Sequence, residues 1–177
     1  NDSIFETVEQ SSQILKLELL MKKAGVTPKE RKVVAPALIR ADETGNPAAA
    51  MELPDGRIVT GRTSDLLGAS SALLLNALKV LGGLPDDLHM ISPIVLEPIQ
   101  NLKTNHLGNR NPRLHTDETL IALSISASTN PMAKHAMEQL GKLRGCDVHS
   151  SVILSQVDER TFKRLGVNLT CEPRYQG

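Results

Sequence analysis

The stretch AAAMELPDGRIVT, residues 48–60, decides how the chain is expected to fold. Two extended arms, residues 48–53 and 57–60, flank the turn residues Pro-Asp-Gly at 54–56. Turn residues between two arms of this kind are typical of a β-hairpin. An antiparallel strand pair is therefore predicted here, and the other elements are placed around it.

The segment that follows the hairpin, Ser64 to Leu81, is apolar on nearly every side when it is placed on a helix. A helix of this kind is buried rather than amphipathic, so this one is predicted to form the centre of the domain. Its residues 68–72 are all small, which would let another part of the protein approach closely.

The remaining elements lie on both sides of this centre. Strands come as a hairpin early and singly late, with helices grouped between them, which favours the α+β class over a regular βαβ winding. We expect a small mixed or antiparallel sheet that includes the hairpin, packed by the central buried helix and several shorter helices, in a single domain over residues 1–177. The other predicted elements are helices over residues 4–24, two short helices to about Glu43 with a break or kink at Pro36, a helix from Ser92 that Pro98 interrupts before Asn105, helices from Thr116, from Asn130 to about Gly145 and from Ser155 to Leu165, and strands over 89–91, 148–154 and 167–171.

Composition excludes several classes of function. Twenty basic residues balance twenty acidic ones, which removes the broad attraction that nucleic acid or an anionic membrane would use. The aromatic residues are only Phe5, Phe162 and Tyr175, too few for a platform that stacks single-stranded bases. No apolar run approaches the roughly 20 residues of a membrane span. Two cysteines are too few for a disulfide scaffold, so we expect a cytoplasmic protein. From the charge balance, the few aromatic residues and the short apolar runs, we expect it to bind neither nucleic acid nor membrane.

Residues 56–63, Gly-Arg-Ile-Val-Thr-Gly-Arg-Thr, have the spacing of a phosphate-binding P-loop, with Arg62 at the lysine position. That mechanism needs a loop between the glycines, and these residues are predicted to form a strand. A milder hypothesis keeps Gly61, Arg62, Thr63 and Ser64 as an anion-binding site, because they join a strand to a predicted helix start. An ordinary helix cap is the alternative interpretation.

Catalytic candidates come from two places in the sequence. His115 and Asp117, with Glu118, lie beside one predicted helix start, and His149 lies at a predicted strand start before two serines. A nucleophile and a base could meet there, so His115, Asp117 and His149 are the catalytic candidates. The alternative is that the histidines are structural and that the acidic residues stabilise the positive end of a helix.

One short pattern in the sequence has the spacing of metal ligands. Cys146 and His149 have a Cys-x-x-His spacing, to which Cys171 or His115 could add ligands. Structural zinc needs four ligands, and no second tight pair exists. We therefore expect no metal, and predict a buried free thiol beside a surface histidine.

Several of these strings, in this order along the chain, resemble one bacterial family, the domain of unknown function eighteen-forty-six. The resemblance implies that the chain is the C-terminal domain of a longer protein and that its own N-terminal part is its main partner. No established activity comes with the family. Some members carry the label ATP-dependent zinc protease, but this sequence lacks a His-Glu-x-x-His motif. The strings are residues 53–64, 91–93, 97–100, 111–115 and 152–158, and the similarity continues through 169–173.

Two functional hypotheses follow. The first is that the domain supplies one wall of a phosphate- or nucleotide-linked active site shared with the missing N-terminal part, through Arg62, Thr63, Ser64 and His115. The second is a non-catalytic module that joins copies of the protein into a homo-oligomer or holds its N-terminal part, favoured by the apolar helix and the zero net charge. The sequence does not indicate which cofactor, if any, the protein uses. Whether Arg62 and His115 face one cleft distinguishes the two hypotheses.

Overall fold

The computed structural model describes residues 31–175, so the helix predicted over residues 4–24 lies outside the described residues. The predicted hairpin is confirmed: strand β1 (Ala48–Glu52) pairs antiparallel with β2 (Ile58–Arg62). Its turn is closed by the Leu53 N–H, which donates to the Arg57 carbonyl over 2.8 Å. Gly56 has a φ of 89°, a left-handed conformation that glycine adopts without strain.

The hairpin is half of a four-stranded mixed sheet with the order β2-β1-β3-β4. β3 (Asp147–Ser150) pairs antiparallel with β1, and β4 (Asn168–Cys171) pairs parallel with β3. The parallel pair is joined by helix α7 (Gln156–Leu165), which gives one βαβ unit inside an otherwise antiparallel arrangement. The expected α+β class with a small mixed sheet is therefore confirmed.

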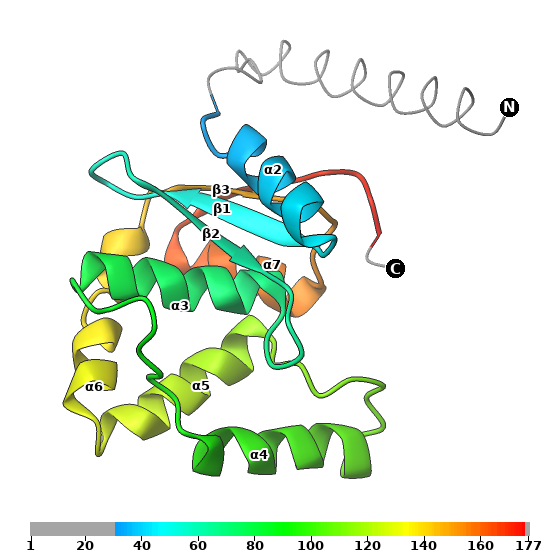
Figure 1. Ribbon diagram of the computed structural model, residues 1–177, viewed down its shortest axis with the longest axis vertical. Coiled ribbons are helices and arrows are strands. Elements are labelled where there is room, and N and C mark those ends of the chain that lie inside the picture. The colour runs from blue at the N-terminus through cyan, green and yellow to red at the C-terminus, as the bar shows by residue number, and fades with distance from the viewer. Residues whose placement is uncertain (1–30, 176–177) are drawn as a thin grey trace, which may run out of the picture.

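Helices cover both faces of this sheet. Helix α2 (Val34–Thr44) lies on one face, and α3 (Ala69–Leu81) and α7 lie on the other. A further layer lies below α3 in Figure 1. It comprises α4 (Pro93–Asn101), the π-helix η1 (Leu102–His106), α5 (Thr116–Ala127) and α6 (Pro131–Met137), and the 3₁₀ helix η2 (Leu140–Leu143) follows it along the chain.

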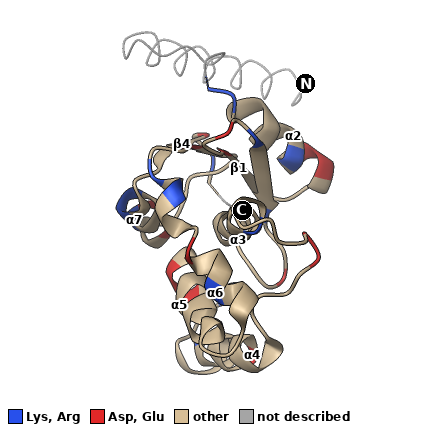
Figure 2. Cartoon of the chain, turned by 90° about the vertical axis from the view of Figure 1, so that its left-hand side faces the viewer, with Lys and Arg blue, Asp and Glu red and all other residues tan. Residues whose placement is uncertain are grey.

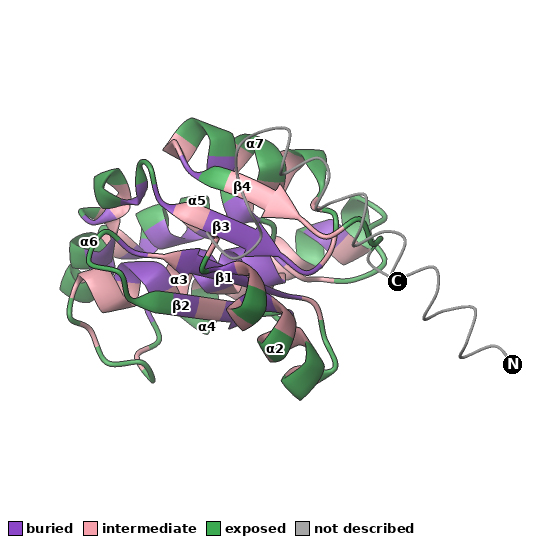
Figure 3. Ribbon diagram, turned by 90° about the horizontal axis from the view of Figure 1, so that it is seen from above, coloured by how far each residue is buried: buried purple, intermediate pink, exposed green. Residues whose placement is uncertain are grey.

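The alternation of side chains along β1 builds a core on each face of the sheet. Ala49 and Met51 join the main core, which α3 completes, whereas Ala50 packs with Val33 and Ala37 beneath α2. Successive strand residues point to opposite faces, and both faces of this strand are covered. Figure 3 accordingly shows β1 and β3 as buried strands, while β4 at the edge is only partly buried.

Helix α3 packs directly on β2, and Gly61 makes this possible. A Cβ atom at Gly61 would lie 2.2 Å from the backbone nitrogen of Leu73, so only glycine fits. The central helix is buried as predicted, but it begins at Ala69 rather than at Ser64. The reason is local: the Ser64 hydroxyl accepts from the Leu67 N–H over 3.3 Å, which closes a turn before the helix.

Three other expectations need correction. Residues 89–91 form no strand; Met90 and Ile91 are buried without pairing in the sheet. Pro36 does not break α2, because it lies in the first turn, where its missing N–H is not needed. Pro98 does not end its helix either, since α4 continues to Asn101 and passes into the π-helix.

Two of the helices carry residues of both charge signs. Figure 2 shows basic and acidic residues close together on both α2 and α7. Among residues 31–175, none of the helices has the length and apolar character that crossing a bilayer requires.

Candidate anion-binding site

A pocket of about 370 Å³ lies at the N-terminal end of α3. We call it the α3 pocket. Three segments that are far apart in the sequence form it: the start of α3, the loop before α5, and the connection from β3 to α7. It is lined by Pro47, Thr63, Gly68, Ala69, Ser70, Lys103, Asn109, Arg110, Asn111, Arg113, Leu114, His115, Val152, Leu154, Ser155 and Asp158.

The first turn of α3 offers hydrogen-bond donors to this pocket. The N-cap residue Gly68 has no side chain to cap the helix, and Thr63 takes over part of that task by accepting from the Ala69 N–H over 3.2 Å. Ser70 lies in the same turn and is only 2% exposed, yet its hydroxyl has no hydrogen-bond partner in residues 31–175. A buried hydroxyl is normally paired, so this one, in a residue of the pocket lining, has hydrogen-bonding capacity that the described residues do not use. The positive end of the helix dipole favours an anion.

The loop before α5 is fastened to the segment that precedes α3. Arg113 donates from Nε to the Ser64 carbonyl over 2.8 Å, and Leu114 donates from its N–H to the Leu66 carbonyl over 3.1 Å. Ser71 of α3 donates its hydroxyl to the Leu114 carbonyl over 2.9 Å. These contacts fix the backbone from which Arg113 and His115 project.

A buried ion pair supports the same loop from below. Lys103 of the π-helix is 2% exposed, and its Nζ donates to the Arg113 carbonyl over 2.5 Å and to Glu118 Oε1 over 2.6 Å. The same carboxylate oxygen accepts from the His115 N–H over 2.8 Å. One ammonium group and one carboxylate therefore hold residues 113–115 in place. A π-helical turn alters the register of a helix, and such turns are frequent at functional sites.

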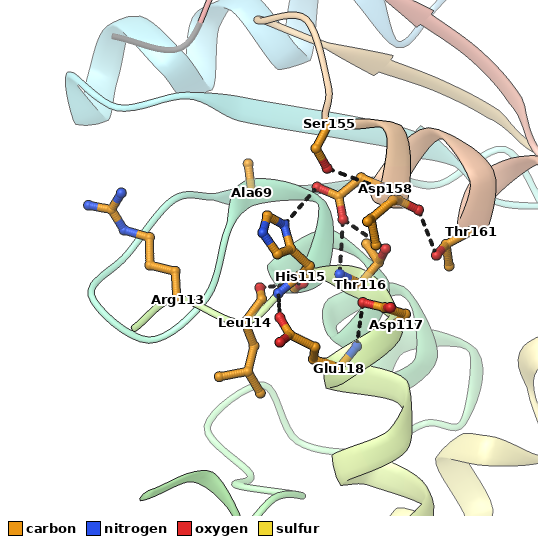
Figure 4. Close-up of polar contacts among 12 residues, drawn as sticks. Ala69, Arg113, Leu114, His115, Thr116, Asp117, Glu118, Ser155, Asp158 and Thr161 are labelled. Atoms are coloured by element: carbon orange, nitrogen blue, oxygen red, sulfur yellow. Dashed lines mark hydrogen bonds and ion pairs between the residues drawn. The ribbon is translucent and has the colours of Figure 1, made fainter. Parts of the chain in front are cut away.

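His115 and Asp158 form an ion pair at the wall of the pocket (Figure 4), with Nδ1 3.8 Å from Oδ2. The neighbouring Asp158 carboxylate raises the pKa of His115 above its ordinary value, against the effect of partial burial. Burial disfavours the charged form of Asp158, but the contact with His115 and two bonds from Thr116 outweigh it. The Thr116 N–H and hydroxyl donate over 2.9 and 2.8 Å, and the pKa of Asp158 falls below its ordinary value.

Two cations of the pocket are left without a carboxylate. Lys103 is paired with Glu118, and His115 with Asp158. Arg110 and Arg113 make no ion pair with any carboxylate of the described residues. The pocket therefore combines a helix N-terminus, an unpartnered hydroxyl and two uncompensated guanidinium groups, which is the chemistry of an anion site.

The four residues predicted to bind an anion have different surroundings. Thr63 lines the pocket. Gly61 lies against Leu73 and serves the packing of α3. Arg62 is exposed at the end of β2 and does not line the pocket that His115 lines, so the two residues do not share this cleft. Ser64 does not line it either, and closes the turn before α3. Residues 56–62 form the end of the hairpin turn and strand β2, as predicted, and not the loop that a P-loop requires.

The three catalytic candidates are not brought together. His115 lines the pocket, and Asp117 is exposed, with its Oδ1 accepting from the Glu118 N–H over 2.8 Å. His149 lies on β3 and is only 2% exposed, so the prediction that it is a surface histidine is wrong. Its Nδ1 lies 2.7 Å from the Thr170 hydroxyl and its Nε2 lies 3.0 Å from Glu172 Oε1. That hydrogen bond holds the pKa of Glu172 below its ordinary value.

The cysteines are both free thiols. Cys146 is buried, and burial raises the pKa of its thiol. Cys171 is partly buried, and burial raises its pKa as well. A thiol with a raised pKa is a poor nucleophile and a poor metal ligand, because both roles require the thiolate.

Sequence reasoning missed most of the residues that form the pocket. Ser70 was noted only as one of several small residues, and Asp158 only as part of a helix start. Lys103 carries no local signal, because its pairing with Glu118 depends on the fold. One kind of signal was available: two strings that contribute to the family resemblance contain pocket residues, Arg113 and His115 in 111–115 and Ser155 and Asp158 in 152–158.

Comparison with known proteins connects the chain to a family. The family model described as "Domain of unknown function DUF1846, C-terminal" matches residues 29–177. A UPF0371 protein of Corynebacterium glutamicum is 55% identical over 161 residues, which cover 91% of this chain and 32% of that protein. A UPF0371 protein of Streptococcus pneumoniae is 50% identical over 163 residues, 92% of this chain and 33% of that protein. The chain thus spans about a third of the length of these relatives. It belongs to the DUF1846 family and corresponds to the C-terminal domain of that family.

Proposed function

We propose that this domain binds a phosphate group in the α3 pocket and so supplies one wall of a phosphate-linked active site in a longer protein. The single observation that carries the proposal is the Ser70 hydroxyl, which is buried at a helix N-terminus that lines the pocket and has no partner within residues 31–175. Leaving such a group unpaired costs about 1 to 3 kcal/mol, which a bound oxyanion would recover.

The surrounding charges support an oxyanion rather than a neutral ligand. Arg110 and Arg113 are the uncompensated cations, and guanidinium groups bind phosphate through paired hydrogen bonds. His115, with its raised pKa, adds a donor that is charged in more of the neutral range than an ordinary histidine. In the active site that we propose, His115 donates a proton or a hydrogen bond to the bound group, and Asp158 orients its ring.

The relatives explain why the site would be shared. The chain accounts for 32% of the C. glutamicum protein, so two-thirds of that protein lies outside it. An active site built from this pocket and from the upstream part would place its remaining groups on residues that this chain does not contain.

Titration of the 177-residue chain with inorganic phosphate tests the proposal. Arg110→Ala should weaken binding about tenfold or more, because a hydrogen bond to a charged group is worth about 1.5 to 3 kcal/mol. Arg62→Ala is the matched control: it removes the same charge from an exposed arginine outside the pocket, and should leave the affinity nearly unchanged. Phosphate binding that depended on Arg62 and not on Arg110 would refute the assignment of the site.

A second candidate function is an assembly module, and exposed apolar side chains favour it. The apolar helix that first suggested it, α3, is buried inside the domain and cannot serve as the interface. Exposed residues lie elsewhere: Ile94 of α4 is 84% exposed, and Ile121 and Ile125 of α5 are also exposed. Light scattering of the chain at increasing concentration tests this candidate, since a constant monomer mass would argue against self-association.

A further inference from the structure

We infer that the ligand of the α3 pocket is the phosphomonoester of a small hydroxylated molecule, such as a sugar or polyol phosphate. The inference rests on the proposed function and makes it more specific. It depends on three properties of the pocket: its count of uncompensated charges, the kind of side chains beyond the phosphate position, and its volume.

The charge count favours a monoester. Lys103 and His115 each face a carboxylate, Glu118 and Asp158 respectively, whereas Arg110 and Arg113 face none in the described residues. Two positive charges are therefore available to the ligand. A phosphomonoester carries close to two negative charges at neutral pH. A phosphodiester carries only one, so it would leave one guanidinium group of the pocket uncompensated.

The lining beyond the start of α3 favours hydroxyl groups. Asn109 and Asn111 present amides, and Ser155 presents a hydroxyl. The Asn111 Oδ1 accepts from the Arg113 N–H over 3.1 Å, which leaves its NH₂ group as a donor. The Ser155 Oγ accepts from the Asp158 N–H over 3.2 Å, which leaves its own proton to donate. These groups can donate hydrogen bonds to the hydroxyl oxygens of a ligand.

The same lining disfavours a nucleobase. No aromatic residue is among those that line the pocket, and the apolar ones are small or branched. The aromatic residues of the described chain lie elsewhere: Phe162 is fully buried in the core, and Tyr175 is outside the lining. A base bound in this pocket would find no Phe, Tyr or Trp ring to stack on, and in the proposed complex Arg110, Arg113 and His115 are engaged with the phosphate. Its volume of about 370 Å³ is at the small end for ligand sites and suits a compact molecule.

A panel of ligands tests the inference on the 177-residue chain by isothermal titration calorimetry. The panel is inorganic phosphate, glycerol phosphate, a hexose phosphate, adenosine monophosphate and dimethyl phosphate. We expect at least one of the two hydroxylated monoesters to bind about tenfold tighter than inorganic phosphate, and adenosine monophosphate to gain nothing over it. Dimethyl phosphate, a diester, should bind at least tenfold more weakly than inorganic phosphate.

Two variants separate the inference from the function on which it rests. Ser70→Ala should weaken all the phosphate ligands together and leave thermal stability equal or higher, because it removes a buried hydroxyl that has no partner in the fold. Asn109→Ala should weaken the hydroxylated esters while sparing inorganic phosphate. If phosphate binds but the hydroxylated esters bind no tighter, the substrate class is wrong and the anion site stands. If no ligand binds, or if Ser70→Ala lowers stability and spares binding, both fall.

Discussion

The surroundings of His115 and His149 differ in a way that their sequence contexts did not reveal. Each histidine faces a carboxylate, Asp158 for His115 and Glu172 for His149. The His149 side chain is 2% exposed and has a partner on each ring nitrogen. The His115 side chain is 45% exposed, and its ring lines a pocket beside a hydroxyl that has no partner.

The difference teaches how a structural histidine can be told from a functional candidate. The partners of His149, Thr170 and Glu172, come from β4 and the residue after it, so its hydrogen bonds hold the sheet edge together. Its polar groups are satisfied and have no capacity left for a substrate. The His115 pair engages only Nδ1, so Nε2 has no partner among the described residues, and Arg110 and Arg113 line the same pocket. Unused hydrogen-bonding capacity at an accessible place is the property that marks the second site.

The largest effect is expected from a change at His149. His149→Ala should lower the free energy of unfolding by about 4 kcal/mol, because it removes a buried ring and leaves the Glu172 carboxylate without its partner. Phosphate affinity of the folded fraction should stay within about twofold. His115→Ala should do the opposite, costing less than about 1 kcal/mol of stability while weakening phosphate binding. Denaturant unfolding and phosphate titration of both variants provide the check, and equal stability losses would contradict the distinction.

The next effect concerns Lys103 and Glu118, which hold residues 113–115 at the α3 pocket. Lys103→Met should cost about 3 kcal/mol, because it breaks a buried ion pair and leaves the Arg113 carbonyl without its donor. It should also weaken phosphate binding, since residues 113–115 lose one anchor. Glu118→Gln is the companion variant, because its amide oxygen can still accept from the His115 N–H. A double-mutant cycle of the two changes should show strong coupling, and additive costs would show that the pair does not act as a unit.

The smallest effect is on pH dependence. The pKa of His115 is raised above its ordinary 6.5, so the pair's contribution through His115 is complete below 6.5 and is lost as pH rises through the raised value. The pKa of Asp158 is lowered from 3.8, so its contribution is present above 3.8 and is lost as pH falls through the lowered value. Asp158→Asn should therefore bring the NMR titration midpoint of His115 down to 6.5 or below, at a cost of about 1 kcal/mol in acidic to neutral solution.

Asp117→Asn is the control for that titration. Asp117 is exposed and its carboxylate contacts the Glu118 N–H rather than the His115 ring. The midpoint of His115 should stay where it is in the unmodified chain. A midpoint that fell equally in both variants would mean that Asp158 is not the specific partner.

Local signals in the sequence predicted most of the described fold. The hairpin at 48–60 and the helix that begins after Ser155 were placed correctly, because their turn and capping residues act within a few positions. The helix that begins after Asn130 has the predicted start but ends at Met137, short of the predicted Gly145, and a 3₁₀ helix follows at Leu140–Leu143. Two errors have different causes. The start of α3 moved to Ala69 because the Ser64 side chain closes a turn before the helix, which is a local effect. The apolar residues at 89–91 are buried without pairing in the sheet, and only tertiary contacts decide this.

The candidate site was less predictable for the same reason. The lining residues of the α3 pocket come from parts of the chain that are far apart in the sequence, and only Thr63 and His115 were predicted site residues. The glycine of the P-loop-like string, Gly61, has a packing role that depends on how closely Leu73 approaches it. The unpartnered hydroxyl of Ser70 is a property of its surroundings: the adjacent Ser71 donates to the Leu114 carbonyl, whereas Ser70 has no partner among the described residues.

A crystal of the chain soaked in tungstate, a heavy analogue of phosphate, tests the central claim most directly. The anomalous signal should locate an anion in the α3 pocket, within hydrogen-bonding distance of Ser70 and beside Arg110 and Arg113. The same soak of Ser70→Ala should reduce its occupancy. A signal beside Arg62 at the end of β2, or an α3 pocket left without tungstate while other surface sites fill, would contradict the account.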